Sequence, residues 1–390
     1  MLAALVAVAL VLVAAAVVLG RTAQPSGRTV VTVRLWDQQV AAAYRESFTQ
    51  FTREHPDIEV HVNVVSYATY FDTLRTDVAG GGADDIFWIN NSYFAEYADN
   101  GRLMPIDPAP DWEPSVVDQF TRNGVLWGVP QLTDAGIALY YNADLLAADG
   151  VSPAELGDAR WDPDPAIDTL RPLLTRLTHG RQWGYNAAND LQGIYLNYIG
   201  SAGGAFTTGD RFAFDNPGAV TAFDYVVGLI NTDRVSPPAS DTNDNGDFSR
   251  NQFLAGRVAV FQSGTYNLAQ IAQQATFRWG VTMLPTGPAG RVSVTNGIVA
   301  AGNPASRNPA AVREVLAWLG GARGNEFVGR HGAAIPAVLP AQRAYFDYWS
   351  AKGVDVTPFF AVLQGPRIAA PGGAGFAAGY QAIKPYFDEM

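Results

Sequence analysis

The chain has 390 residues, more than one hydrophobic core usually serves, so we expect two domains. Hydrophobic residues make up 48% and charged residues 16% of the sequence, which is typical of a folded protein and excludes a disordered one. Lys and Arg number 26 against 37 Asp and Glu, and the resulting net charge of −11 argues against a nucleic-acid or lipid-surface protein. Cys is absent and the 4 His are dispersed, so we expect no disulfide, no metal site and no cofactor.

The first twenty residues form a separate segment. Leu2 to Leu19 is an unbroken apolar run, and Arg21 is the first charged residue. As a helix this run would span roughly 30 Å, enough to cross a bilayer. It is either a signal peptide cleaved near Gly20 or an uncleaved membrane anchor, followed by a flexible linker that extends to residue 28. Both interpretations place the remaining chain outside the cytoplasmic membrane, either secreted or in the cell envelope.

From residue 29 onward, predicted strands and helices alternate. Residues 29–35, 58–65 and 85–89 are rich in β-branched and apolar residues and are expected to be strands. Helices are expected between them at residues 41–54 and 70–78. This alternation predicts an α/β fold with a mainly parallel sheet, and ligands in such folds bind beyond the carboxyl ends of the strands.

The same alternation returns in the second half of the chain. Helices are expected at residues 218–231 and 308–320, and strands at residues 257–261 and 279–284. No repeat of fixed period accompanies it. The pattern is that of a second α/β unit.

The sequence contains no complete P-loop, nucleophile elbow or calcium-binding loop. Neither lysine follows a glycine, so there is no P-loop, and no G-x-S-x-G nucleophile elbow occurs. The segment from Asp241 to Gly246 follows the first half of a calcium-binding loop, but Gln252 stands where such loops place a bidentate Glu. We interpret this segment as an Asx-rich turn that leads into a helix.

Aromatic residues stand beside polar residues at or just past the predicted strand ends. They are Trp36, Tyr67, Trp88, Tyr93 and Tyr266. A sugar ring presents an apolar face that stacks on aromatic rings, and a rim of hydroxyls that amides and carboxylates orient. The pattern therefore indicates a carbohydrate-binding cleft.

Several segments, in this order and spacing, resemble the extracellular solute-binding proteins of carbohydrate ABC importers, which are similar in plan to maltose-binding protein. The resemblance covers nearly all of the chain after residue 29. The segments that carry it are VTVRLW (31–36), ADDIFWINNSYFAEYADNGRLMPI (83–106), GVPQLTDAGIALYYNADLL (128–146), GSAGGAF (200–206), FLAGRVAVFQSGTYNL (253–268), WGVTMLPTGP (279–288) and the predicted helix at 309–319.

This resemblance implies two α/β lobes joined by a hinge, with the ligand in the cleft between them. The chain would cross between the lobes near Asn142, Leu284 and Gly321. After a leader of residues 1–28, the implied boundaries are 29–142 and 283–322 for the first lobe, and 143–282 and 323–390 for the second.

The resemblance also implies ligand contacts where the motifs match, with Tyr266 as the stacking ring. Carboxylates at three of these positions would favour neutral sugars and cationic amino sugars over anionic ones. The implied contacts are Trp36, Asp37, Gln38, Tyr67, Trp88, Asn91, Ser92, Asp134, Asp190, Gln192, Tyr195, Tyr266, Asn296 and Gly297.

The implied function is capture of a mono- or oligosaccharide by a monomeric binding protein, which delivers it by hinge closure to the transmembrane permease subunits of an ABC importer. The lipobox cysteine of the family is missing, so the apolar N-terminus would replace the usual lipid anchor. Two alternatives stay open. One is a binder of a glycerophosphodiester or another small polar solute, for which Arg367 is the one arginine in a suitable loop. The other is a glycoside hydrolase, which would also carry aromatics and carboxylates near strand ends.

Overall fold

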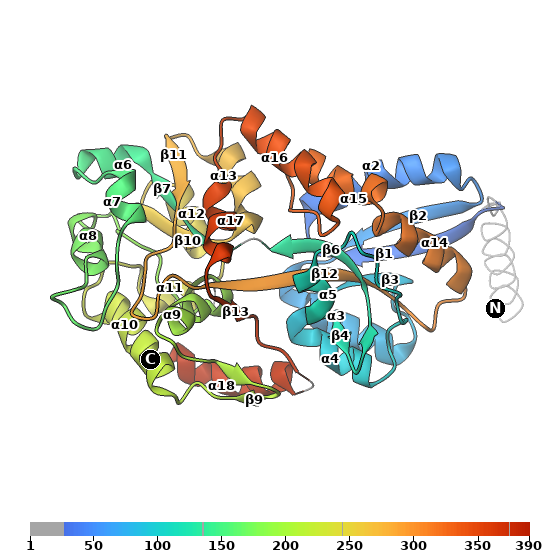
Figure 1. Cartoon of the computed structure of the whole chain (residues 1–390), viewed down its shortest axis with the longest axis horizontal. Coiled ribbons are helices and arrows are strands. Elements are labelled where there is room, and N and C mark those ends of the chain that lie inside the picture. Colours follow the sequence, from blue (N-terminus) through green and yellow to red (C-terminus); the bar gives the residue numbers. More distant parts are fainter. Residues whose placement is uncertain (1–26, 135, 244, 374) are drawn as a thin grey trace, which may run out of the picture.

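The computed structural model describes residues 27–134, 136–243, 245–373 and 375–390. The apolar run from Leu2 to Leu19 lies outside these ranges. The described chain forms two α/β lobes that lie side by side, which confirms the predicted fold class (Figure 1). None of the helices in the described part of the chain is long and apolar enough to cross a membrane.

The first lobe is built on the predicted parallel strands. Strand β1 (Thr29–Leu35) lies between β2 (Ile58–Val64) and β3 (Ile86–Asn90) and pairs with both in parallel. These bounds agree with the sequence prediction to within a residue. Alternate residues of β1 are fully buried, and the helices that follow β1 and β2 cover the sheet.

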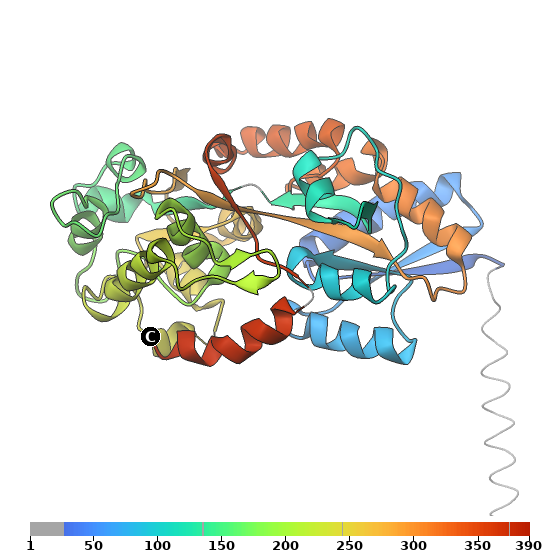
Figure 2. The same cartoon turned by 60° about the horizontal axis from the view of Figure 1, so that its bottom comes forward.

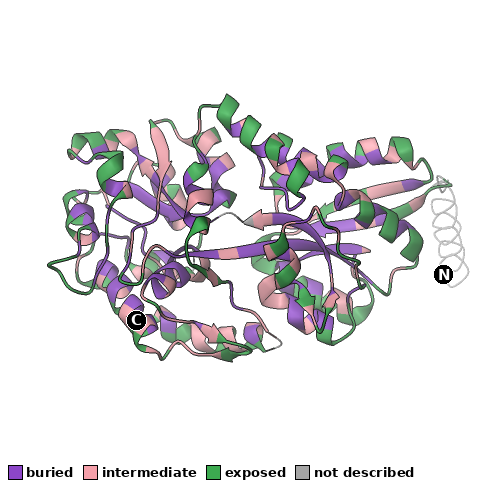
Figure 3. Cartoon of the chain, in the orientation of Figure 1, coloured by how far each residue is buried: buried purple, intermediate pink, exposed green. Residues whose placement is uncertain are grey.

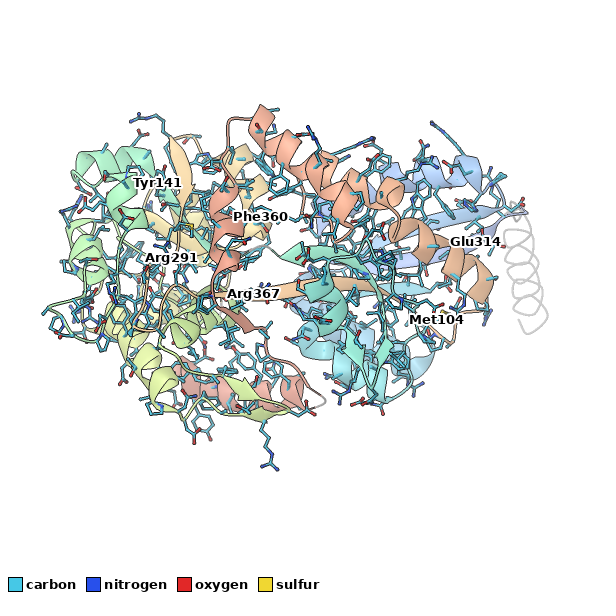
Figure 4. The ribbon with its side chains drawn as sticks, in the orientation of Figure 1. Met104, Tyr141, Arg291, Glu314, Phe360 and Arg367 are labelled. Atoms are coloured by element: carbon cyan, nitrogen blue, oxygen red, sulfur yellow. The ribbon has the colours of Figure 1, made fainter. Side chains whose placement is uncertain are left out.

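The long strand β12 (Ser293–Gly302) joins the two lobes. Its second half pairs antiparallel with β3 and with β6 (Val129–Asp134), which completes the sheet of the first lobe. Its first three residues pair in parallel with β13 (Arg367–Ala369), next to the second lobe. Figure 1 shows β12 running from one lobe into the other, and Figure 4 shows Arg367 near the middle of the molecule.

The second lobe has a smaller sheet with a different strand arrangement. Strand β7 (Ala138–Asn142) lies between β10 (Val260–Ser263) and β11 (Trp279–Thr282), and both pairings are antiparallel. The expectation of a mainly parallel arrangement is wrong for this sheet. The reason is the long helical excursion between β7 and β10, which lets the chain return in either direction.

The helices lie outside these sheets, with buried faces turned inward and exposed faces turned to solvent (Figure 3). Those of the first lobe are α2 (Gln38–Glu54), α3 (Tyr67–Gly80), α4 (Asn91–Asp99), α5 (Pro114–Gln119), α14 (Pro309–Leu319) and α15 (Ala322–Arg330). Those of the second are α6 (Ala143–Ala148), α7 (Pro153–Gly157), α8 (Leu170–Arg176), the π-helix η1 (Leu191–Tyr195), α9 (Leu196–Ser201), α10 (Pro217–Asn231), α11 (Ala239–Thr242), α12 (Phe248–Leu254) and α13 (Leu268–Gln274).

The C-terminal elements connect and overlay the lobes. They are α16 (Gln342–Ala351), α17 (Thr357–Ala361) and α18 (Phe376–Asp388), with short 3-10 turns at η2 (Thr265–Asn267), η3 (Leu339–Ala341) and η4 (Val362–Gln364). Two-residue strands form the hairpins β4 (Thr121–Arg122) with β5 (Val125–Leu126), and β8 (Thr207–Thr208) with β9 (Arg211–Phe212). Helix α18 runs along the underside of the second lobe and reaches α4 of the first (Figure 2).

The boundaries of the lobes differ from the sequence expectation at all three crossings. The second crossing lies within β12 instead of near Leu284, because Leu284 and Val294 pack in the core of the second lobe. Helix α15 packs against α2, and Ala337 forms backbone hydrogen bonds with Gln131 and Glu113, so this segment belongs to the first lobe and not the second. The third crossing therefore follows residue 341, along α16. The first crossing lies before β7 instead of near Asn142, because β7 is the central strand of the second sheet.

Candidate functional site

A cavity of about 670 Å³ is lined by residues of both lobes. The first lobe contributes the ends of β1 and β3, the middle of β12, and the starts of α2, α3 and α4. The second lobe contributes the segment before η1, the loop between α11 and α12, the end of β10, and α18. The lining residues are Trp36, Asp37, Tyr67, Trp88, Asn90, Ser92, Tyr93, Leu132, Asn186, Ala188, Asn189, Asp190, Leu191, Gln192, Leu196, Thr242, Asn245, Gly246, Asp247, Ser249, Arg250, Phe261, Ser263, Thr265, Tyr266, Asn267, Asn296, Ile298, Ala333, Ala334, Ala370, Pro371, Phe376 and Tyr380.

A cluster of rings forms the wall of the first lobe. Trp36 follows β1, and its ring meets those of Tyr67 and Trp88 edge to face at centroid distances of 5.5 and 5.0 Å. Trp88 is fully buried behind Trp36, and its Nε1 donates a hydrogen bond of 3.2 Å to the hydroxyl of Tyr44. Tyr67 is 56% exposed. The cluster thus has a rigid buried base and two ring surfaces at the cavity.

Tyr266 supplies the ring on the wall of the second lobe. It lies in the 3-10 turn η2, just after β10, and is 44% exposed. A Cβ atom on Gly264 would overlap the Tyr266 ring, so glycine at this position lets the ring lie against the backbone. The backbone at Gly264 therefore fixes the position of the exposed Tyr266 ring in the cavity wall.

Two carboxylates of the cavity cap helices. Asp37 begins α2, where its Oδ1 accepts hydrogen bonds from the amides of Gln39 and Val40 at 2.8 and 2.9 Å. Asp190 begins η1, where its Oδ1 accepts from the amide of Gly193 at 2.8 Å. Desolvation by the surrounding protein raises the pKa of both carboxyls, although Asp190 stays partly in contact with solvent, and the helix amides counteract only part of that effect. Each acid therefore stabilises a helix start in the cavity wall.

Arg250 is the one basic residue among the described residues that line the cavity. It lies in α12, with an Nη2 to Asp247 Oδ1 distance of 3.0 Å and an Nη1 to Asn267 Oδ1 distance of 3.3 Å. Sequence reasoning missed Arg250 and interpreted the segment before it only as a turn. Thr242, Asn245 and Gly246 of that segment also line the cavity.

The structure brings many of the expected contact residues together at this cavity. Several of them come from segments far apart in the sequence. The expected residues that line it are Trp36, Asp37, Tyr67, Trp88, Ser92, Asp190, Gln192, Tyr266 and Asn296.

The structure places four of the remaining expected residues outside the cavity lining. Gln38 is exposed at the start of α2. Tyr195 is 3% exposed and contacts Phe223 in the core of the second lobe, so its expected role at the site is wrong. A Cβ atom on Gly297 would lie 2.9 Å from Val116, which shows that this glycine serves close packing of α5 on β12. Asn91 is the fourth.

Two further expected contacts, Asn91 and Asp134, lie at or just past strand ends of the first lobe. The Asn91 side-chain amide donates a hydrogen bond to the carbonyl of Ala370, while the preceding Asn90 lines the cavity. The expectation was therefore one residue off at this strand end, because the last residue of β3 and the first of α4 point different ways. Asp134 ends β6 and pairs in register with Asn296, and its side chain lies outside the described part of the chain.

Comparison with known proteins identifies the family. A model of the bacterial extracellular solute-binding proteins matches residues 36–326. The crystal structure of M. tuberculosis UspC is 71% identical, covers 93% of this chain and 94% of its own, and gives a TM-score of 0.76. An ABC substrate-binding protein from Listeria monocytogenes, in complex with cycloalternan, is 20% identical with a TM-score of 0.81 and 93% coverage of both chains.

A more distant relative agrees with this assignment. A binding protein of Brucella abortus (strain 2308) is 24% identical over 88% of this chain and 84% of its own length. Because the family model spans most of both lobes, the chain belongs to the bacterial extracellular solute-binding proteins.

Proposed function

We propose that this solute-binding protein captures a carbohydrate in its interlobe cavity and delivers it to the permease subunits of an ABC importer. The observation that carries the proposal is the opposition of ring surfaces, Trp36 and Tyr67 on one lobe and Tyr266 on the other, around a cavity of about 670 Å³. That volume suits a mono- or oligosaccharide. Solved proteins of the same fold hold cycloalternan and maltose, which supports this class of ligand.

The charge of the cavity favours a neutral or cationic sugar. Asp37, Asp190 and Asp247 line it, and Arg250 already pairs with Asp247. A buried anionic group would meet three carboxylates and, among the described lining residues, a single guanidinium, that of Arg250, which already pairs with Asp247. This argues against the glycerophosphodiester alternative and allows an amino sugar, whose ammonium can pair with a carboxylate.

The hydrolase alternative needs an acid and a second carboxylate that are free to act on a glycosidic bond. Asp37 and Asp190 are instead engaged in capping helices. We therefore propose binding without turnover. Incubation with chromogenic glycosides should release no chromophore, and measurable release would count against a pure binding role.

Tyr266→Ala should weaken sugar binding by ~1–3 kcal/mol, or about ten- to hundredfold, in the range of binding hot spots. A thermal-shift screen of D-glucose, D-glucosamine, maltose and trehalose first identifies a ligand, because binding raises the melting temperature. Calorimetry then compares the variants. Tyr386→Ala is the control, since Tyr386 is 71% exposed and does not line the cavity. Equal affinities of wild type and Tyr266→Ala would show that the cleft is wrongly assigned.

Binding of an amino sugar should depend on pH. Desolvation raises the pKa of the Asp37 and Asp190 carboxyls, so on acidification they become neutral earlier than an ordinary aspartate does. The affinity for D-glucosamine relative to D-glucose should therefore be highest near neutral pH and fall as the pH falls through these raised values.

Asp190→Asn tests this dependence, because asparagine also caps helices and leaves the fold intact. Near neutral pH the variant should bind D-glucosamine about tenfold more weakly, since a hydrogen bond to a charged group is worth ~1.5–3 kcal/mol. Asp347→Asn, on the exposed face of α16, is the matched control. A preference for D-glucosamine that is the same in both variants at every pH would contradict the prediction.

The cavity should close on its ligand by rotation of near-rigid lobes about the crossings. One ion pair at the cleft edge is loose and exposed: Arg122 Nη2 lies 3.8 Å from Asp210 Oδ2, and the two side chains are 27% and 60% exposed. Small-angle scattering should show a smaller radius of gyration at saturating ligand. An unchanged radius would count heavily against closure.

The family is extracellular, so the binding lobes act outside the cytoplasm. We propose that the protein acts as a monomer and that the apolar run from Leu2 to Leu19 keeps it at the outer face of the cytoplasmic membrane, unless a peptidase cuts near Gly20 and releases it. If the run is not cleaved, the full-length protein should sediment with the membrane fraction, and sequencing of the mature N-terminus should recover residues before Gly20. A soluble product that begins at Arg21 would rule out the anchor.

A further inference from the structure

We propose that Asn90 and Asn189, on opposite walls of the cavity, are hydrogen-bond acceptors kept for donors of the ligand, and that Asp388 of α18 is a positioning residue that orients Asn189. The proposal rests on the proposed function and specifies the ligand further. Neither asparagine stands out in the sequence, because each adjoins a residue with a more obvious polar role.

Asn90 is an N-cap residue that does not cap. It ends β3 and precedes α4, a position where asparagine normally accepts a hydrogen bond from a helix amide, yet its side chain makes no such bond. Asn90 is 6% exposed and lines the cavity, and its Oδ1 is buried without a hydrogen-bond partner among the described residues. The adjacent Asn91 and Ser92 donate to the carbonyls of Ala370 and Pro371. Asn90 therefore leaves an amide oxygen free at this corner of the cavity.

Asn189 has a fixed orientation. Its Nδ2 donates a hydrogen bond of 2.6 Å to Oδ1 of Asp388, and Lys384 Nζ lies 2.6 Å from the second carboxylate oxygen. A carboxylate only accepts, so the NH₂ group of Asn189 must face Asp388 and its Oδ1 must face away. That Oδ1 is buried with no partner among the described residues, and Asn189 lines the cavity. The C-terminal helix thus determines which amide atom is left for a ligand.

Two unsatisfied acceptors in one cavity indicate what the ligand must carry. Buried polar atoms without partners are uncommon, and each one needs an explanation. For an acceptor in the wall of a binding cavity, a hydrogen-bond donor of the ligand provides it. Hydroxyl and ammonium groups donate hydrogen bonds, whereas phosphate and carboxylate oxygens of a ligand only accept. Arg250 Nε is a buried donor without a partner in the same wall, and a hydroxyl oxygen can accept from it. The set of atoms selects a ligand rich in hydroxyls, with donors at both walls.

The experiment uses the full chain and the tightest-binding of D-glucose, D-glucosamine, maltose and trehalose. Asn90→Leu and Asn189→Leu keep the side-chain size and remove the acceptor, and each should weaken binding by about tenfold or more, measured by calorimetry. Asn231→Leu is the matched control. Asn231 is exposed at the end of α10 and donates to the Met390 carbonyl, so this variant also removes a contact to the C-terminus, but outside the cavity. Its affinity should equal that of wild type.

Asp388→Asn tests the orienting role separately. Monodeoxyfluoro analogues of the same sugar replace one hydroxyl donor by fluorine, which cannot donate. The analogue that lacks the donor facing Asn189 should bind wild type about tenfold more weakly than the parent sugar. In Asp388→Asn the amide of Asn189 can turn its NH₂ group to the cavity, so the difference should shrink to about threefold or less. A merely structural role of Asp388 would weaken all analogues equally.

The outcomes separate this inference from the proposed function. If no sugar of the panel binds wild type, both are overturned. If a sugar binds and the folded leucine variants keep wild-type affinity, this inference alone is overturned. If the leucine variants fail to fold, as judged by melting temperature, Asp388→Asn decides, and an unchanged discrimination against the fluoro analogues overturns the inference.

Discussion

Strand β12 belongs to both lobes, and the geometry of the cavity depends on the hydrogen bonds at its two ends. At the first end, Val294 donates its amide to the side chain of Asn197 at 3.0 Å, and Ser293 Oγ accepts from the amide of Ile137 at 2.8 Å. At the other end the strand forms antiparallel hydrogen bonds with β3 on one side and β6 on the other. Asn296 is the first residue of β12 that pairs with β6, and it lines the cavity. One continuous strand therefore sets the distance between the walls, and the lobes can move relative to each other only by bending about it and the other crossings.

Each wall of the cavity contains an aspartate that caps the start of a helix. Asp37 holds the start of α2, and Asp190 holds the start of η1. Burying a carboxylate is costly, and hydrogen bonds from helix amides with the positive end of the helix dipole offset part of that cost. The remaining cost is visible in the raised pKa of both groups. Because each carboxylate is fixed by hydrogen bonds to a helix start, the charged positions of the cavity wall are also rigid.

The sequence predicted those parts of the molecule that depend on local pattern. The strands at 29–35, 58–65 and 85–89 followed from β-branched runs, and Trp36 and Tyr266 followed from aromatics at strand ends. The predictions from the sequence were wrong where the structure depends on contacts between residues that are far apart in the chain. The amphipathic pattern of α15 does not say which lobe covers it, and the direction of β7, β10 and β11 is set by connections that periodicity does not describe.

The wrong predictions within the site arise from the orientation of single side chains. Tyr195 has the polar neighbours expected of a binding residue, but it follows Asp190 by a helical spacing that turns its ring into the core. Asn90 and Asn91 differ by one residue at the change from strand to helix, and only the structure shows that the amide of Asn91 is already used by Ala370. Arg250 was missed because its place in the cavity depends on a loop that the sequence marks only as polar.

The net charge of −11 is a poor guide to the ligand, because the ligand meets only the few charged groups at the cavity and the partners that these groups already have. Arg250 pairs with Asp247, while Asp37 and Asp190 face helix amides. A ligand entering such a cavity exchanges its hydration for the few polar atoms that the protein has left without partners. A hydroxyl can donate a hydrogen bond to one such atom and accept one from the next. It therefore satisfies both donors and acceptors of the protein without bringing a charge into the cavity. Selectivity in this cleft then follows from which hydrogen bonds remain to be made, and the aromatic walls supply the affinity that such bonds alone do not give.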